Sequence, residues 1–87
     1  MKKIIIDVRE EFEYKSGHYE SAVNIPLSKF QDKDFIYKEI PLEAETIVYC
    51  RSGGRSSVAK QFLESYGYKN VKNGINQQYL EENISKI

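Results

Sequence analysis

The chain has 87 residues, a length that fits one small domain, and we expect residues 1–87 to form a single compact domain. Its 13 basic and 13 acidic side chains cancel, so the charge gives no support for nucleic acid or an anionic membrane as a partner. With 40% hydrophobic and 30% charged residues, the composition is that of an ordinary globular protein.

Four segments have the composition of β-strands. The first, Ile4-Ile5-Ile6-Asp7-Val8, is almost wholly apolar, which is typical of a strand buried on both faces of a parallel sheet. The other predicted strands cover residues 22–25, 46–49 and 70–72, and the last of these has the weakest pattern.

Helices are predicted between and after these strands. Ser28 and Gln31 form a capping-box pattern that predicts a helix running to about Lys38. From Ser56 onward, apolar residues at helical spacing predict another helix, which Gly67 would end. Shorter helices are predicted at residues 9–16 and 77–84. This alternation favours an α/β fold, in which a small parallel β-sheet is flanked by helices on both faces.

The expected sheet places two polar side chains together. Ligands of parallel α/β sheets bind at the carboxyl ends of the strands. Asp7 lies near that end of the first strand, and Cys50 follows the third strand directly. We therefore expect both residues at the same edge of the sheet.

Cys50 is the only cysteine, so neither an internal disulfide nor a two-thiol redox cycle can form within one chain. The apolar run Ile4-Ile5-Ile6 is too short for the core of a signal peptide or for a membrane span. We expect a cytoplasmic protein with no membrane partner, monomeric at this size.

The segment from Cys50 to Arg55 carries the strongest functional signal. Gly53 and Gly54 permit positive φ angles and close backbone approach, so successive N–H groups can surround an anion. Two of the three arginines in the chain, Arg51 and Arg55, lie in this loop, and a helix begins after it. A lone cysteine is more often a small buried hydrophobe than a nucleophile. In this setting we expect instead an accessible thiol with a lowered pKa, able to attack an anionic substrate.

Three segments of the chain, in this order, resemble the rhodanese-like sulfurtransferases, and small single-domain members above all. They are Ile6–Tyr14, Gly17–Pro26 and Val48–Ser56, and Leu63–Val71 is a weaker fourth match. The cysteine loop alone is moderately specific, whereas the ordered set is highly specific and covers nearly the whole chain.

The resemblance implies that Cys50 is the catalytic residue, and that its thiolate takes sulfane sulfur from a small anionic donor such as thiosulfate, or from a polysulfide or persulfide. The Cys50 persulfide would then pass its sulfur to cyanide or to a thiol acceptor, either a small molecule or a protein, with no metal or organic cofactor. Asp7, Arg9 and Ser56 would support the site. The implied substrate-binding residues are Arg51, Ser52, Gly53, Gly54 and Arg55.

Two alternatives stay open. One is a non-catalytic persulfide carrier or redox-sensing module, since the family often has a Gly-Gly pair after Val71 and this chain has Asn73-Gly74-Ile75-Asn76. The other is a cysteine phosphatase or arsenate reductase, favoured only by the cysteine and arginine of the loop. Phosphatases of this kind place five residues between the two, whereas this chain has four, Arg51 to Gly54. The smaller loop suits sulfur better than phosphate.

Overall fold

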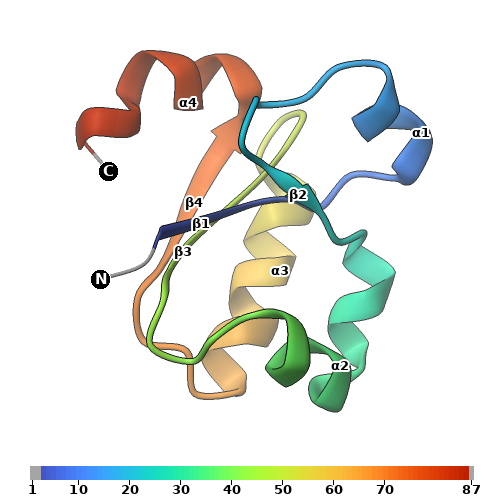
Figure 1. Cartoon of the computed structure of the whole chain (residues 1–87), viewed down its shortest axis with the longest axis vertical. Helices are drawn as coiled ribbons and strands as arrows, with labels where there is room; N and C mark the ends of the chain where they lie inside the picture. The colour runs from blue at the N-terminus through green and yellow to red at the C-terminus, as the bar shows by residue number, and fades with distance from the viewer. Residues whose placement is uncertain (1–2, 87) are drawn as a thin grey trace.

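The computed structural model of the chain describes residues 3–86 and shows strands and helices in alternation (Figure 1). Its elements, with 3-10 helices written η, are β1 (Lys3–Asp7), α1 (Glu11–Lys15), β2 (Val23–Asn24), η1 (Leu27–Gln31), α2 (Lys33–Glu39), β3 (Glu45–Cys50), α3 (Gly54–Ser65), β4 (Val71–Asn76), α4 (Gln77–Asn83) and η2 (Ile84–Lys86). Within residues 3–86, no helix combines the length and the apolar character needed to cross a bilayer.

The four strands form one parallel sheet in the order β2-β1-β3-β4. β1 and β3 pair along their whole length, from Lys3 opposite Glu45 to Asp7 opposite Tyr49. Cys50 follows Tyr49, so Asp7 and Cys50 lie at the same carboxyl edge, as expected from the sequence. This edge positions the candidate site.

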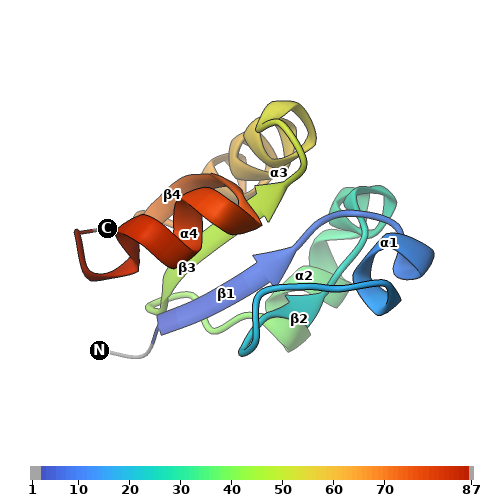
Figure 2. The ribbon, with the colours of Figure 1, turned by 90° about the horizontal axis from the view of Figure 1, so that it is seen from above.

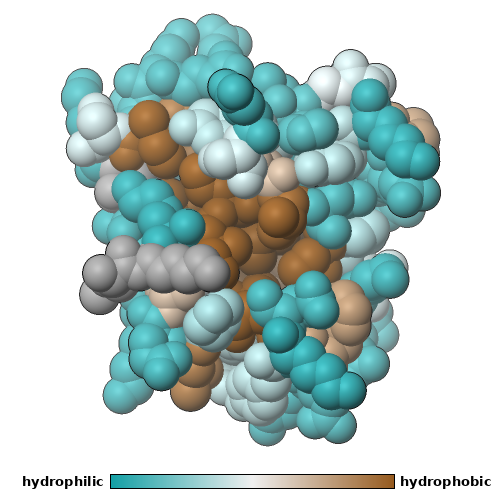
Figure 3. Space-filling model, viewed as in Figure 1, coloured by the Kyte–Doolittle hydropathy of each residue, from teal (hydrophilic) through white to brown (hydrophobic). Residues whose placement is uncertain are grey.

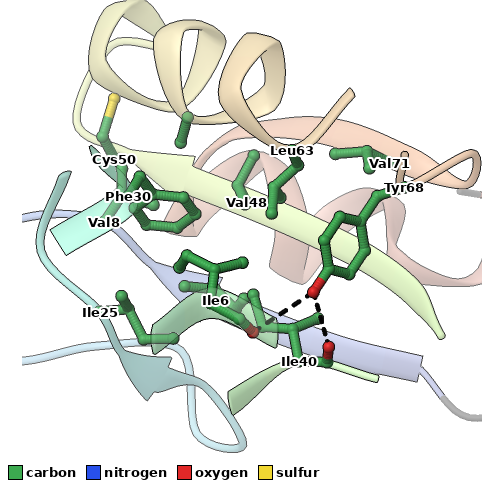
Figure 4. Packing of buried hydrophobic residues seen from close by; sticks show 12 residues of the cluster. Ile6, Val8, Ile25, Phe30, Ile40, Val48, Cys50, Leu63, Tyr68 and Val71 are labelled. Carbon is green, nitrogen blue, oxygen red and sulfur yellow. Dashed lines mark hydrogen bonds between the residues drawn. The ribbon is translucent and has the colours of Figure 1, made fainter. Parts of the chain in front are cut away.

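Helices cover both faces of the sheet, which confirms the predicted α/β class. Figure 2 shows α4 on one side of the strands and α2 and α3 on the other. The larger of two hydrophobic clusters lies on the side of α2 and α3 (Figure 4), where the Tyr68 hydroxyl donates to the carbonyl of Ile40 at 2.7 Å. The smaller cluster, Ile5, Ala22, Ile47, Tyr49 and Leu80, lies on the opposite face, where Figure 3 shows apolar side chains gathered beside the strands.

The helix predicted from Ser28 to Lys38 is wrong in its start. Residues in this stretch form η1 and then α2, because Asp32 has an extended backbone (φ −95°, ψ 96°) that separates them. The Asp32 side chain caps α2 by accepting a hydrogen bond from the Phe35 N–H at 3.1 Å. The residue that starts the helix is therefore Asp32, not Ser28.

Two other boundaries also differ from the sequence prediction. α3 begins at Gly54 rather than at Ser56, with Gly53 as its N-cap in the left-handed conformation (φ 95°). The weak strand predicted at 70–72 continues to Asn76. The earlier start of α3 shortens the free part of the cysteine loop, and the longer β4 gives Cys50 a strand partner, Asn76.

The longer β4 contains a bulge next to the candidate site. Val48 pairs with Asn73, but the next residue of β3, Tyr49, pairs with Ile75, so Gly74 is the extra residue. A Cβ at Gly74 would lie 2.7 Å from Leu80 Cδ2, so a larger residue there would force the buried Leu80 side chain to move. After the bulge Ile75 has a φ of 66°, a rare conformation for a β-branched residue.

Candidate active site

Cys50 ends β3, and its sulfur lies at the base of the loop that leads into α3. The Gly53 N–H donates to Cys50 Sγ at 3.1 Å, and Ser56 Oγ lies 3.5 Å from the sulfur. Figure 4 shows Cys50 at the rim of the larger cluster, with its sulfur directed toward the start of α3. The residue is 2% exposed, so the expectation of an accessible thiol is wrong: the same packing that fixes the sulfur also covers it.

The surroundings of the sulfur stabilise its ionised form. Burial raises the pKa of the Cys50 thiol, but hydrogen bonds that the ionised sulfur can accept from the Ser56 hydroxyl and from the N–H groups of Ser56, Ser52 and Gly53 outweigh it and lower the pKa to about 7. At neutral pH this thiol is therefore ionised to a much greater extent than an ordinary cysteine, which agrees in direction with the sequence prediction.

The predicted substrate-binding residues surround this sulfur in different ways. Arg51 and Ser52 are exposed in the loop, while Gly53 and Gly54 begin α3. Of these residues, Arg51 has no hydrogen bond or ion pair with any other part of the chain that the structure describes. Its guanidinium is therefore free to meet an anion from solvent.

Arg55, in contrast, already holds an anion. Its Nη1 and Nη2 donate to the two carboxylate oxygens of Glu13 on α1, at 2.7 and 3.1 Å. Together with the Glu10 N–H, this pairing lowers the pKa of Glu13 to about 2. The ion pair holds α1 against the first turn of α3. Arg55 therefore helps to fix the position of the loop and also contributes positive charge to it.

Asp7 and Arg9 form a buried brace at the end of β1. Arg9 Nη2 and Nε donate to Asp7 Oδ2 at 2.7 and 3.1 Å, and Nη2 also reaches the Gly17 carbonyl at 2.7 Å. The Tyr49 hydroxyl donates to Asp7 Oδ2 at 2.9 Å and accepts from the Tyr19 N–H at 2.9 Å. Neither Asp7 nor Arg9 is bonded to Cys50. Arg9 ties the end of β1 to Gly17 directly, and Asp7 is linked to Tyr19 through the Tyr49 hydroxyl.

Sequence reasoning missed Asn73, which contacts both ends of the cysteine loop. Its Oδ1 accepts from Ser56 Oγ at 2.7 Å and from the Ile75 N–H at 2.9 Å, and its Nδ2 donates to the Gly53 carbonyl at 3.2 Å. The only signal in the sequence was its place in the segment that departs from the family pattern.

Two more residues of the site were not predicted from the sequence. Glu13 was invisible as a partner of Arg55 because 42 residues separate them, although it lies inside the first segment with family likeness. Tyr49 precedes Cys50 in a strand, so its side chain points to the opposite face and packs in the smaller cluster.

The family profile described as "Rhodanese-like domain" matches residues 1–76. Thiosulfate sulfurtransferase PspE of Escherichia coli K12 is 38% identical over 69 residues, which are 78% of this chain and 64% of that protein. A tRNA uridine(34) hydroxylase of Buchnera aphidicola is 32% identical over 94 aligned positions, which cover 97% of this chain and 29% of that protein. A Schizosaccharomyces pombe relative is 36% identical over 80 residues.

The chain thus spans less than two thirds of these curated relatives, with 56% of the fission-yeast protein covered. Two solved structures match over more of their length. A structure described as a rhodanese with anions from E. coli is 33% identical with a TM-score of 0.79, over 88% of this chain and 89% of that one. The human single-domain sulfurtransferase TSTD1 is 28% identical with a TM-score of 0.77, over 93% and 83% of the two chains.

Proposed function

The chain belongs to the rhodanese-like domain family, and from this membership we propose that it is a sulfurtransferase that carries sulfane sulfur on Cys50. The observation that carries the proposal is the thiol itself, which has a pKa of about 7 and lies under a loop of backbone N–H groups and arginines. Its relatives include proteins named thiosulfate sulfurtransferase and single-domain sulfurtransferase.

The proposed reaction has two steps. In the first, the Cys50 thiolate attacks the outer sulfur of thiosulfate, the S–S bond of thiosulfate breaks, and sulfite leaves with the electron pair. The product is a Cys50 persulfide anion. In the second step, cyanide or a thiolate attacks the outer sulfur, and the bond between that sulfur and Cys50 Sγ breaks. Cys50 leaves as the thiolate, and the product is thiocyanate or the persulfide of the acceptor thiol. Neither step needs a metal or an organic cofactor.

The loop supplies what both steps require. A terminal persulfide sulfur carries a negative charge, and the N–H groups of Ser52, Gly53 and Ser56 already stabilise negative charge at the cysteine sulfur. α3, whose N-terminal turn starts at Gly54, adds the positive end of its dipole. The exposed Arg51 would attract an anionic donor such as thiosulfate.

The assay is thiocyanate formation from thiosulfate and cyanide, with a polysulfide as second donor. We expect activity with wild type and none with Cys50→Ala. A matched control is Ser65→Ala, which changes a similar small side chain at the far end of α3. Activity that survives Cys50→Ala would rule out the proposed chemistry.

A persulfide carrier or redox-sensing module is the second candidate, and the 2% exposure of Cys50 favours it. A covered sulfur slows attack by small donors, and a protein partner that displaces the loop would then be the physiological donor or acceptor. In that case cyanide turnover with small donors is slow although the Cys50 persulfide forms. Fast turnover without a partner would argue against the carrier.

The phosphatase or arsenate reductase alternative gains nothing from the geometry. The arginine that would grip a phosphate, Arg55, is paired through both terminal nitrogens with Glu13. Hydrolysis of a small aryl phosphate that is lost in Cys50→Ser would revive it. We further propose that the protein is cytoplasmic and monomeric, and size-exclusion chromatography tests the oligomeric state.

A further inference from the structure

The Asn73 side chain has one possible orientation. The Ile75 N–H, which can only donate, points at one end of the Asn73 amide at 2.9 Å, so that end is the oxygen. The Gly53 carbonyl, which can only accept, lies 3.2 Å from the other end, so that end is the nitrogen. Two backbone groups thus fix the assignment of Oδ1 and Nδ2.

This orientation determines where the Ser56 hydroxyl proton goes. Asn73 Oδ1 can only accept, and it lies 2.7 Å from Ser56 Oγ, so Ser56 donates its single proton to Asn73. Ser56 Oγ then presents lone pairs to Cys50 Sγ, 3.5 Å away, and can only accept from the thiol S–H. The resulting chain of donors runs from Cys50 to Ser56 to Asn73 and favours the neutral thiol over the thiolate.

A thiolate needs the opposite arrangement. To stabilise ionised Cys50, the Ser56 hydroxyl has to turn its proton from Asn73 to the sulfur and give up the shorter of its two contacts. Asn73 keeps the Ile75 N–H in either state, so it does not itself have to move. We propose that Asn73 is a positioning residue that competes with Cys50 for the Ser56 proton and thereby sets the pH at which the nucleophile forms.

The effect of Asn73 on the Ser56 proton can be measured separately from the effect of the charged groups near the site. They are Arg51 in the loop, Arg55 on α3, Glu13 on α1, and the Asp7–Arg9 pair at the end of β1. Arg55 interacts electrostatically with the Cys50 sulfur. No hydrogen bond of Asn73 involves any of them, so a neutral replacement of Asn73 leaves their charges in place.

The inference rests on the proposed role of Cys50 as a nucleophile, but its test measures the ionisation of the thiol and not the sulfurtransferase activity. The probe is the rate of alkylation by iodoacetamide from pH 5 to 10 (roughly the range around an ordinary cysteine pKa), in the full chain. Asn73→Leu removes the acceptor and frees Ser56 to donate to sulfur. We expect the pH midpoint of the alkylation rate to fall by about half to one pH unit, which is the equivalent of one net hydrogen bond.

The same substitution in a Ser56→Ala background separates the proposal from a purely structural role. Without the hydroxyl there is no proton to compete for, so we expect Asn73→Leu to lower the midpoint only when Ser56 is present. If Asn73 merely holds Gly53 through its carbonyl, its loss loosens the Gly53 N–H from the sulfur and raises the midpoint in both backgrounds. A rise, no change, or an equal shift in both backgrounds overturns the proposal.

Asn73→Asp is the second variant and keeps an acceptor for Ser56. It retains the competition and adds a negative charge near the sulfur, so we expect the midpoint to rise above that of wild type. A midpoint below wild type contradicts the proposal even if Asn73→Leu fails to fold. Because alkylation needs no sulfur donor, a failed thiocyanate assay would leave this result standing.

Discussion

Glu13 grips Arg55 through both carboxylate oxygens, at 2.7 and 3.1 Å, across 42 residues of sequence. Because of this pair, the two loop arginines have different roles. Arg55 is largely committed to holding α1 against α3, whereas Arg51 is exposed and unpaired among residues 3–86. The identity of the donor should therefore depend on Arg51 more than on Arg55.

Arg51→Gln should weaken the use of thiosulfate. Loss of a charge-assisted contact of about 1.5–3 kcal/mol would raise the KM for thiosulfate by about tenfold or more, with a smaller change in kcat. The matched control is Lys60→Gln, which removes the same charge from the middle of α3. Steady-state kinetics would contradict the assignment if the KM for thiosulfate were the same in Arg51→Gln as in wild type.

The Glu13–Arg55 pair should make stability depend on pH in the acid range. Hydrogen bonds from Arg55 and from the Glu10 N–H lower the pKa of Glu13 from 4.5 to about 2. A depressed carboxyl pKa stabilises the fold above the unfolded value and loses that contribution as the pH falls toward the folded value. Between pH 4.5 and about 2, the free energy of unfolding should fall less steeply in Glu13→Gln than in wild type.

Urea denaturation at a series of pH values measures this difference. Glu11→Gln is the control, because Glu11 is 73% exposed and lies 3.9 Å from Lys15. It should keep the wild-type slope. An identical slope in Glu13→Gln and wild type would show that the pair has no role in acid stability.

Tyr49→Phe should destabilise the fold without touching the sulfur. It removes the hydroxyl that links Asp7 to the Tyr19 N–H and leaves both without this partner. A lost buried hydrogen bond of this kind costs about 1–3 kcal/mol. Tyr79→Phe, at a tyrosine that is 39% exposed, should change the free energy of unfolding little. Equal free energies of unfolding for the two variants would show that the Tyr49 hydroxyl does not stabilise the fold.

Gly74→Ala tests the bulge in β4. The added Cβ would lie 2.7 Å from Leu80 Cδ2 and 3.0 Å from Ile47 Cγ2, so these two buried side chains have to move. Overpacking of this kind costs about 1–3 kcal/mol. Gly54→Ala offers a comparison, since no heavy atom lies within 4 Å of its added Cβ. In thermal unfolding, the Tm of Gly74→Ala should be well below the Tm of Gly54→Ala. The reverse order would contradict the close contacts at Gly74.

The sheet was predictable because its strands carry their own pattern. The apolar run from Ile4 and the run before Cys50 each identify a buried strand, and parallel pairing then brings Asp7 and Cys50 to one edge. The start of α2 was not predictable from the capping pattern at Ser28. Asp32 competes with it, and only the packed structure decides between two nearby caps.

The site was predictable in its nucleophile and less so in its partners. Cys50 and its glycines lie within one short segment, Cys50–Gly54, so their spacing alone identifies the loop. The burial of the sulfur, the pairing of Arg55 with Glu13, and the bonds of Asn73 all depend on contacts between elements distant in sequence. Local pattern carries no information about such contacts.

The central claim is that Cys50 carries sulfur, and intact mass spectrometry after incubation with thiosulfate tests it most directly. We expect wild type to gain the mass of one sulfur atom, located on Cys50 by peptide mapping and removed by cyanide with release of thiocyanate. Cys50→Ser should gain nothing. A wild-type protein that stays unmodified with both thiosulfate and polysulfide, or an adduct that persists in Cys50→Ser, would contradict the account.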